Sequence, residues 1–421
     1  MLDIKFIREN AELVKEAAQK KNIAFDVHEL LSADDNRKAI LAEVEAMRGK
    51  QNEIADAVPR AENADAREKL IAESKSLKEI LQAKELELIT AMHTWQALMV
   101  QVPNIPDMSV PEGKDDADNV EVRTWGAIPK FDFTPKDHIE LMEKLDLVDF
   151  ERGTKMAGFR GYVLKNDGML LNFALWQFVL AKFVAKGFTP ILVPSLVKRE
   201  TMVGTGYLPQ GEEDLYKTQD GDFLAGTGEV GTMAYYMDEV LRKEDFPKKF
   251  IAFSPCFRRE AGSHSKDTKG LMRVHEFFKM EQVVLCEAVH EESVKYHEEL
   301  ATLAEEVMQD LKIPYHVVAN CGGDLGLGQV KKYDIEAWIP SQNTYRETHS
   351  ISYFHDFQTR RLNIRYKDSD GKLRFAHSLN GTAFPTPRPI IALVENYQNA
   401  DGSITIPEVL RPYMGGKEKI G

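Results

Sequence analysis

Arginine, carboxylate and aromatic side chains are concentrated in residues 256–287, which read CFRREAGSHSKDTKGLMRVHEFFKMEQVVLCE. Arg258 and Glu260 precede a polar loop, and Phe277 and Glu281 follow it. A planar guanidinium can hold two phosphate oxygens at once, and an aromatic ring offers a flat face to a base. Carboxylates accept hydrogen bonds from amino groups. The set is therefore suited to a nucleotide base with its phosphate, together with an amine.

The spacing of these residues predicts a β-strand, because strand side chains alternate between two faces. The apolar positions of one face are Val274, Phe278, Met280 and Val284. The opposite face then carries Phe277 and Glu281, with Arg258 and Glu260 supplied by the preceding strand. The same alternation also describes a polar, half-exposed hairpin face that binds nothing, and the pattern alone does not separate the two.

Length and composition limit the class of protein. The chain has 421 residues, enough for two or three domains, and a net charge of −13 that argues against nucleic-acid binding by bulk charge. No segment has the run of ~20 apolar residues that spans a bilayer, and we expect no membrane or DNA partner. The three cysteines lack metal-ligand spacing. A reduced, cytoplasmic enzyme is the simplest interpretation.

The phosphate-loop pattern GxxxxGK[ST] is absent from the chain, and its single GxGxxG match, GTGEVG at 226–231, does not open a predicted βαβ unit. The segment GGDLGLGQ at 322–329 has the wrong spacing for a phosphate loop, and a turn before a strand fits it better. Any nucleotide site must therefore be of another kind.

Two heptad series predict a pair of long helices between about 27 and 100, joined by a turn at Pro59. The positions are Leu30, Ala33, Arg37, Ile40, Val44, Met47, Gln51, Ile54 and Val58, then Leu70, Ser74, Leu77, Leu81, Lys84, Leu88, Ala91, Trp95 and Leu98. The pattern fits an antiparallel coiled-coil hairpin or a dimerisation rod. Residues 101–120, with three prolines and an acidic run, read as a linker.

The motifs together resemble those of the class II aminoacyl-tRNA synthetases. FRRE, a loop and RVHEF resemble motif 2; GFTPILVPSLVKRETMVGTGYLP resembles motif 1, with its proline at Pro194; LNGTAFPTPRPIIALVENYQ resembles motif 3, with its arginine at Arg388. The surrounding sequence, from MLDIKFIREN to the C-terminal IPEVLRPYMGG, is similar to the seryl-tRNA synthetase family. The resemblance covers essentially the whole chain.

The resemblance implies an α+β fold: an antiparallel sheet flanked by helices, preceded by a long coiled-coil hairpin. Residues 1–100 would form a helical arm that binds tRNA(Ser), 101–120 a linker and 121–421 the catalytic domain. The implied activity is ATP-dependent formation of seryl-adenylate and transfer of serine to tRNA(Ser), by a homodimer that uses ATP and Mg²⁺. Arm contacts to RNA would come from basic residues such as Arg48, Arg60, Arg67, Lys75 and Lys78, although solvated helix surface also explains each of them.

The resemblance also implies roles for single residues at the nucleotide. Arg258 would hold the α-phosphate and Arg388 the γ-phosphate, Phe277 would stack on adenine, and Glu260 would accept from its amino group. Glu347 and Ser350 would bind Mg²⁺ and phosphate, and Arg258, Arg388 and Glu347 form the implied catalytic set. Standing alone, Arg258 would be explained at least as well as a structural residue, and Glu347 could be a strand-end carboxylate in a solvent-exposed salt bridge.

The implied serine site contains a carboxylate for the ammonium and polar partners for the rest of the substrate. Its residues are Thr227, Glu229, Arg258, Glu281, Asn380 and Thr382. Four positions depart from the usual family pattern: Gly228, Gly231, Ile351 and Phe384. We expect the two glycines to loosen one wall of the pocket and the two larger residues to add bulk elsewhere, which would weaken rejection of threonine.

Two alternatives remain at this stage. One is an adenylating relative with another amino acid or a non-tRNA acceptor, and the other is a catalytically idle RNA-binding paralogue. The hairpin argues against the first, and retention of the charged residues at the motif positions argues against the second.

Overall fold

The computed structural model describes residues 1–262 and 267–421, and it divides into two compact units. One unit comprises Asp3–Gln19 and Ile23–Pro103. The other comprises Met1–Leu2, Lys20–Asn22 and Asn104–Gly421. The chain therefore enters the larger unit twice before it returns there at Asn104.

The smaller unit consists of helices. They are α1 (Ile4–Glu9), α2 (Ala11–Lys20), α3 (Val27–Ala57), the 3₁₀ turn η1 (Val58–Arg60) and α4 (Ala64–Met99). Asp26 and Asn63 cap α3 and α4 by accepting hydrogen bonds from first-turn backbone N–H groups.

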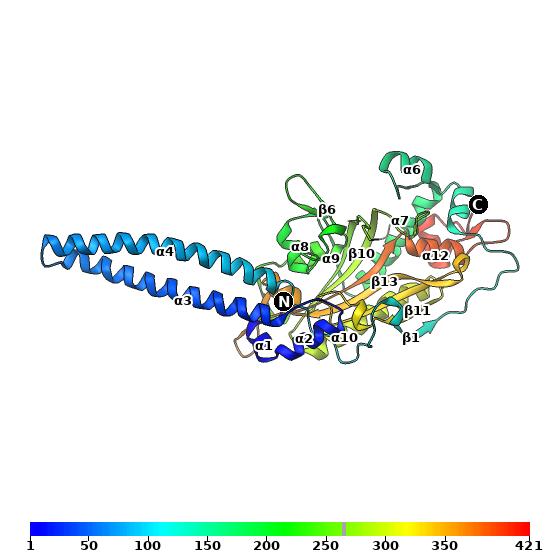
Figure 1. Cartoon of the computed structure of the whole chain (residues 1–421). Coiled ribbons are helices and arrows are strands. Elements are labelled where there is room, and N and C mark those ends of the chain that lie inside the picture. The colour runs from blue at the N-terminus through cyan, green and yellow to red at the C-terminus, as the bar shows by residue number, and fades with distance from the viewer. Residues whose placement is uncertain (263–266) are drawn as a thin grey trace. The chain divides into compact units, whose positions relative to one another are not determined.

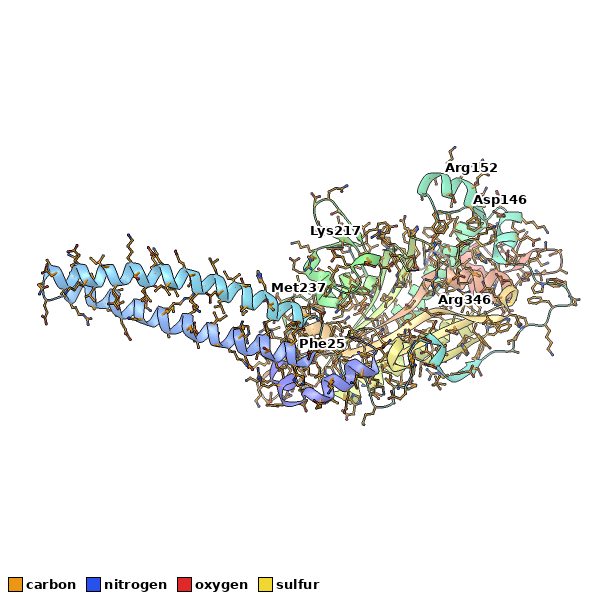
Figure 2. The ribbon with its side chains drawn as sticks, in the orientation of Figure 1. Phe25, Asp146, Arg152, Lys217, Met237 and Arg346 are labelled. Carbon is orange, nitrogen blue, oxygen red and sulfur yellow. The ribbon has the colours of Figure 1, made fainter. Side chains whose placement is uncertain are left out.

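The α3–α4 pair forms the antiparallel hairpin that the heptads predicted (Figure 1). Each heptad position is buried or half-buried, including the polar Arg37 and Lys84. The Arg37 guanidinium lies 4.5 Å from the centre of the Trp95 ring on the opposite helix. Side chains project into solvent along both helices (Figure 2), as expected when only one stripe of each helix is buried.

An eight-stranded sheet organises the larger unit, in the order β1-β11-β12-β13-β16-β10-β9-β4. Every neighbouring pair is antiparallel except β4 and β9. The strands are β1 (Val120–Trp125), β4 (Thr189–Leu192), β9 (Lys248–Phe257), β10 (Glu276–Cys286), β11 (Tyr315–Ala319), β12 (Lys331–Ile339), β13 (Thr344–His355) and β16 (His377–Thr386). The predicted antiparallel sheet is confirmed.

Short strands form small sheets around the large one. They are β2 (Val148–Asp149), β3 (Val163–Leu164), β5 (Leu196–Val197), β6 (Tyr216–Lys217), β7 (Phe223–Leu224), β8 (Val240–Arg242), β14 (Arg365–Lys367), β15 (Leu373–Phe375), β17 (Ile404–Thr405) and β18 (Lys419–Ile420). The helices of this unit are α5 (His138–Lys144), α6 (Phe150–Ala157), α7 (Asn166–Ala185), α8 (Arg199–Thr205), α9 (Gly228–Ala234), α10 (His290–Asp310), α11 (Phe357–Arg361) and α12 (Arg388–Asn396).

The strand β10 is packed on both faces. Its even residues Phe278, Met280 and Val284 join the main core, which α7, α10 and α12 supply with apolar side chains. Its odd residues Val283 and Leu285 join a second cluster with Met233 of α9. The predicted core face is therefore confirmed for Phe278, Met280 and Val284. It is wrong for Val274, which precedes β10 and lines a cavity instead. The other face of β10 is covered too and is not a half-exposed hairpin.

Helix α7 is, within the described residues, the one helix long and apolar enough to cross a membrane by length and composition alone. Within the most apolar 18-residue stretch of α7, 44% is buried inside the protein. Leu171, Leu175, Val179 and Phe183 belong to the main core. The apolar composition of α7 is therefore explained in part by packing on the sheet, a common property of core helices in soluble proteins.

Candidate active site

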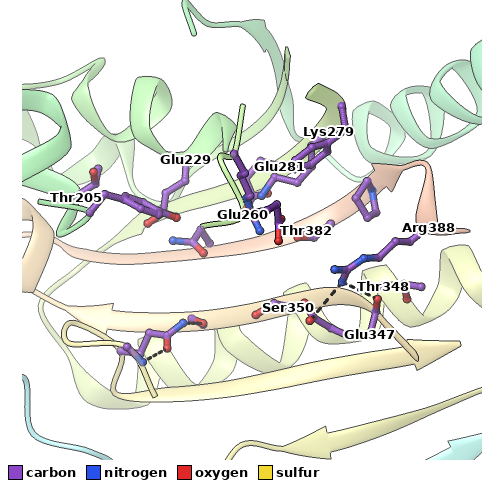
Figure 3. A pocket seen from close by; sticks show the side chains of 18 of the residues that line it. Thr205, Glu229, Glu260, Lys279, Glu281, Glu347, Thr348, Ser350, Thr382 and Arg388 are labelled. Atoms are coloured by element: carbon purple, nitrogen blue, oxygen red, sulfur yellow. Dashed lines mark hydrogen bonds and ion pairs between the residues drawn. The ribbon is translucent and has the colours of Figure 1, made fainter. Parts of the chain in front are cut away.

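A cavity of about 280 Å³ opens over the middle of the large sheet, lined by residues of β10, β13, β16, α9 and the segments around them (Figure 3). It brings together nearly all the residues proposed from the sequence: Glu229, Arg258, Glu260, Phe277, Glu281, Glu347, Ser350, Asn380, Thr382 and Arg388. Thr227 is the exception. It is buried and does not line the cavity, and its hydroxyl caps α9 by accepting from the Glu229 N–H at 3.3 Å.

Side chains of β10 alternate between the cavity and the core, so one strand contributes to both. Phe277, Lys279 and Glu281 all line the cavity, while Phe278 and Met280 face the core. Lys279 and Glu281 are 6% and 2% exposed, so their charges are largely removed from water. Charges in such a place interact more strongly than charges at the surface.

One end of the cavity combines a guanidinium with a ring. The Cζ atom of Arg258, just beyond the end of β9, lies 5.4 Å from the centre of the Phe277 ring. Its Nε donates to the carbonyl of Gly226 at 3.3 Å. Arg273 pairs with Glu260 at 2.7 Å, which orients the carboxylate proposed to read a base.

Arg388 and Glu347 pair at 3.4 Å (Figure 3), and Arg388 also donates to the Glu347 carbonyl at 3.0 Å and the Met272 carbonyl at 3.1 Å. Desolvation acts to raise the pKa of Glu347, but the positive charges of Arg388, Lys332 and Arg258 outweigh it and hold this pKa below its usual range. Glu347 is therefore an ionised carboxylate among cations.

A second carboxylate, Asp334, interacts electrostatically with Glu347. Asp334 of β12 is paired in register with Ser350 of β13, and burial raises the pKa of Asp334 to about 6. Its Oδ2 accepts from the Asn320 amide at 2.7 Å. Within the part of the chain that the structure describes, no three His, Cys, Asp or Glu side chains are grouped as a metal site. Glu347 and Ser350 both line the cavity, and their side chains offer two oxygen donors to a cation.

The other end of the cavity contains two buried carboxylates. Glu281 pairs with Lys279 at 2.6 Å. Glu229 accepts from Tyr207 Oη at 2.9 Å and from the Gln358 amide at 2.5 Å. Burial and the neighbouring Glu281 charge together raise the pKa of Glu229 to about 7. This end is therefore acidic and poor in water, which suits a small cationic or hydroxyl-bearing ligand.

Several residues of the site were not found from the sequence. Lys279 lies on the face of β10 that the alternation had marked, so its position gave a usable signal. Tyr207 and Arg273 lie inside recognised motif segments without a role of their own. Gln358 had no signal, because it follows β13 in a short helix and meets Glu229 only in three dimensions.

The expectation for the four unusual positions was wrong, because none of them lines the cavity. A Cβ at Gly228 would lie 3.1 Å from Ser254 Oγ and 3.4 Å from Glu281 Cβ, within packed protein. A Cβ at Gly231 would approach Val193 Cβ to 2.9 Å, so this glycine permits close packing of α9. Ile351 and Phe384 are fully buried in the main core and add no bulk to the site.

Comparisons with known proteins match this description. Residues 216–397 match the tRNA synthetase class II core domain (G, H, P, S and T), and residues 1–106 match the seryl-tRNA synthetase N-terminal domain. The serine--tRNA ligase of Deinococcus radiodurans is 47% identical over 100% of this chain and 99% of its own. That of Treponema denticola is 42% identical over 99% of each.

Solved structures agree. Seryl-tRNA synthetase from Pyrococcus horikoshii complexed with ATP superposes with a TM-score of 0.89 and 38% identity, covering 100% of this chain and 99% of that one. Cytoplasmic serine-tRNA ligase from Naegleria fowleri in complex with AMP gives a TM-score of 0.85 and 30% identity over 100% and 98%. The fold is that of a class II aminoacyl-tRNA synthetase. Within that class, the chain belongs to the seryl-tRNA synthetase family.

Proposed function

We propose that this chain activates serine with ATP to form seryl-adenylate and then transfers the seryl group to tRNA(Ser). The observation that carries the proposal is the two-ended cavity: arginines and an aromatic ring at one end, and buried carboxylates at the other. ATP use is further supported by the similarity to the Pyrococcus horikoshii enzyme, which was solved complexed with ATP. Similarity over the full length of serine--tRNA ligases disfavours both an adenylating relative with another acceptor and an idle paralogue.

In the first step, a carboxylate oxygen of serine attacks the α-phosphorus of ATP, and the bond to pyrophosphate breaks. Arg258 would neutralise charge that grows on the α-phosphate, since its planar fork suits two phosphate oxygens. Phe277 would stack on adenine and Glu260 would accept from its amino group. Arg388 would hold the γ-phosphate, which becomes part of the leaving pyrophosphate. Positioning and charge neutralisation account for most of such catalysis.

Glu347 and Ser350 would hold Mg²⁺ at the phosphates. Magnesium prefers oxygen donors and is commonly bound by one or two carboxylates, with phosphate and water completing its shell. The ionised state of Glu347 and the hydroxyl of Ser350 fit that requirement. When bound, the ion supplies positive charge that lowers the cost of the developing negative charge on phosphate.

Serine would lie at the acidic end. Glu281 would accept from its ammonium, Arg258 would bind its carboxylate, and Glu229, Asn380 and Thr382 would pair its hydroxyl and fix its orientation. Thr227 would act by capping α9, which orients Glu229. Such a site rejects alanine because its buried polar groups would lose a partner. In the second step, the hydroxyl of the terminal ribose attacks the seryl carbonyl, AMP leaves, and the adenylate phosphate accepts the proton.

The homodimer also belongs to this proposal. Apolar side chains on α7 and around the edge strand β4 are exposed in the single chain: Met169, Leu170, Phe173, Val184, Leu192 and Leu196. Leu192 and Leu196 lie within the segment that resembles motif 1, and Leu192 is 78% exposed. A cluster of exposed apolar residues on a folded protein marks an interaction surface. A second copy of this chain is the partner that the family resemblance implies.

We divide the chain by role into an arm for tRNA (1–100), a linker (101–120) and a catalytic domain (121–421). We also infer a cytoplasmic location. Cys256, Cys286 and Cys321 are free and buried, which is typical of proteins from reducing compartments.

Pyrophosphate exchange with a panel of amino acids, without tRNA, tests the activation step directly. Serine should give the highest kcat/KM. A preference for any other amino acid would overturn the proposed substrate. Failure to charge tRNA(Ser) after normal serine activation would instead overturn the proposed acceptor.

A further inference from the structure

Lys21 is a buried lysine whose ammonium is held by backbone carbonyls. Lys21 is 2% exposed. Its Nζ donates to the carbonyls of Gly326 at 3.1 Å, Leu327 at 3.0 Å and Gln329 at 2.5 Å. No carboxylate among the described residues forms an ion pair with it. Residues Lys20–Asn22 belong to the same compact unit as these carbonyls. Three donors thus meet three acceptors.

The loop that Lys21 holds is a wall of the candidate active site. Gly326, Leu327, Gly328 and Gln329 all line the cavity. The Gln329 side chain closes the loop by accepting from the Gly326 N–H at 2.6 Å, and its amide donates to Ser352 Oγ at 2.8 Å. Ser352 is paired in register with Asn380, one of the residues proposed to bind serine.

This wall lies at the acidic end of the cavity. A Cβ at Gly328 would come within 2.5 Å of the Phe357 ring, and one at Gly206 within 3.1 Å, so both glycines pack on the same ring. The neighbouring Tyr207 donates to Glu229. Figure 3 shows Thr205 and Glu229 at the end of the site opposite to Glu347 and Arg388.

We propose that Lys21 is a positioning residue for amino-acid binding: its ammonium fixes the 326–329 loop as the wall of the serine end. The inference rests on the proposed function and names a residue outside the three motifs. Converging carbonyls repel one another and are costly to bury without a donor. An ammonium offers three donors at a single point, which matches the three carbonyls.

The buried ammonium of Lys21 has a cost as well as a benefit. Burial lowers the pKa of Lys21 to about 7, which shows that the ammonium is costly to keep in this place. An apolar side chain of similar length would avoid that cost but would leave the carbonyls without donors. The three hydrogen bonds from Lys21 offset that cost and hold the carbonyls of the 326–329 loop in one geometry.

The test uses Lys21→Met, with Lys20→Met as its matched control. Lys20 is the adjacent lysine and also donates to a backbone carbonyl, that of Val110 at 2.8 Å, but Val110 is outside the cavity. In pyrophosphate exchange, Lys21→Met should raise the KM for serine about tenfold or more, equivalent to one or two net hydrogen bonds. The KM for ATP and the kcat per active site should stay within about twofold. Lys20→Met should match the wild type.

Lys21→Arg retains charge and donors and serves as the second variant if Lys21→Met does not fold. Its KM for serine should exceed that of the wild type, while its KM for ATP should stay unchanged. Where both variants fold, its KM for serine should also be lower than that of Lys21→Met. An unchanged serine KM in Lys21→Met overturns the proposal, as do equal increases for serine and ATP in either folded variant. A wild-type enzyme that does not activate serine would refute the proposed function instead, which keeps the two failures distinct.

Discussion

The side-chain amide of Gln358 donates to Glu229 at 2.5 Å, although the two residues are far apart in the chain. Gln358 also donates to the carbonyl of Thr205 at 3.2 Å and accepts from Ser378 Oγ at 2.8 Å, so its own orientation is fixed. Since Tyr207 donates to the other Glu229 oxygen, each oxygen of this buried carboxylate has one protein donor. Glu229 therefore presents its remaining lone pairs in a defined direction.

The first prediction concerns pH. If serine needs ionised Glu229 as an acceptor, kcat/KM for serine should fall as pH decreases through about 7, the value to which burial raises the pKa of Glu229. Gln358→Leu removes a donor that lowers this pKa, so the acid limb of the profile should move to higher pH. Gln342→Leu, which removes an exposed partner of Arg346, is the control and should leave the limb in place. An unshifted limb in Gln358→Leu would separate Glu229 from serine binding.

The same group makes a prediction for stability. The folded-state pKa of Glu229 lies above the ordinary value of 4.5 for a glutamate, so the folded protein binds more protons than the unfolded chain between about pH 4.5 and 7. The contribution of Glu229 to the free energy of unfolding is thus fully present below that window and lost as pH rises through it. Glu229→Gln should flatten this part of the stability profile in chemical denaturation. A profile identical to the wild type would contradict the raised pKa.

The third prediction concerns Arg258. Arg258→Ala should reduce serine-dependent pyrophosphate exchange by ~100-fold or more, because a contact to developing charge is worth roughly 3–4 kcal/mol. The fold should persist. The neighbouring Arg259, which is exposed and donates to the carbonyl of Glu213 at 3.1 Å, provides the control variant Arg259→Ala. Near-normal exchange by a folded Arg258→Ala protein would remove this arginine from the mechanism.

The fourth prediction concerns Gly228. Because the added Cβ would meet Ser254 and Glu281 and not the cavity, Gly228→Ala should leave the ratio of kcat/KM for serine and threonine within about twofold. The serine KM should also stay within about twofold, because only Ser254 Oγ at 3.1 Å has to shift slightly while Glu281 Cβ at 3.4 Å is in ordinary van der Waals contact. A methyl that did enter the pocket would change the ratio by ~10-fold or more, and that result would contradict the placement of Gly228 seen here.

The fifth prediction concerns the arm. Deleting residues 36–92 and closing α3 and α4 with a short turn should leave serine activation near the wild-type rate. Charging of tRNA(Ser) should fall by more than about tenfold, since at least ~1.4 kcal/mol of binding would be lost. Aminoacylation and pyrophosphate exchange on one preparation give both values. A parallel loss of the two activities in a folded protein would assign the arm a structural role.

The sixth prediction concerns the exposed apolar surface. Phe173→Glu on α7 should shift the protein towards monomers in sedimentation velocity, because a buried charge at an interface has no partner. Leu373→Glu, at an exposed apolar residue of β15, should not change the sedimentation coefficient. A dimer that persists in Phe173→Glu, or a wild type that is already monomeric, would place the partner elsewhere.

The elements with a regular period could be predicted from sequence. The heptads fixed the α3–α4 hairpin because burial in a helix pair repeats every three or four residues, and Arg37 and Lys84 fitted through their long apolar stems. The alternation in β10 similarly identified Phe277 and Glu281. Gln358 and Lys21 have no such signal, because their partners come from distant segments. Gly228 was misjudged because proximity in sequence to Glu229 says nothing about the direction of a Cβ.

The packing of β10 on two sides has a consequence for engineering. Phe278 and Met280 never face the cavity, yet each lies between two residues that do. Repacking the core at these positions moves the backbone from which Phe277, Lys279 and Glu281 project, so it alters kinetics even where melting temperature is unchanged. A library for a new amino-acid substrate should therefore randomise both faces of the strand together. A library limited to the residues that line the cavity would leave out Phe278 and Met280, which help to set its shape.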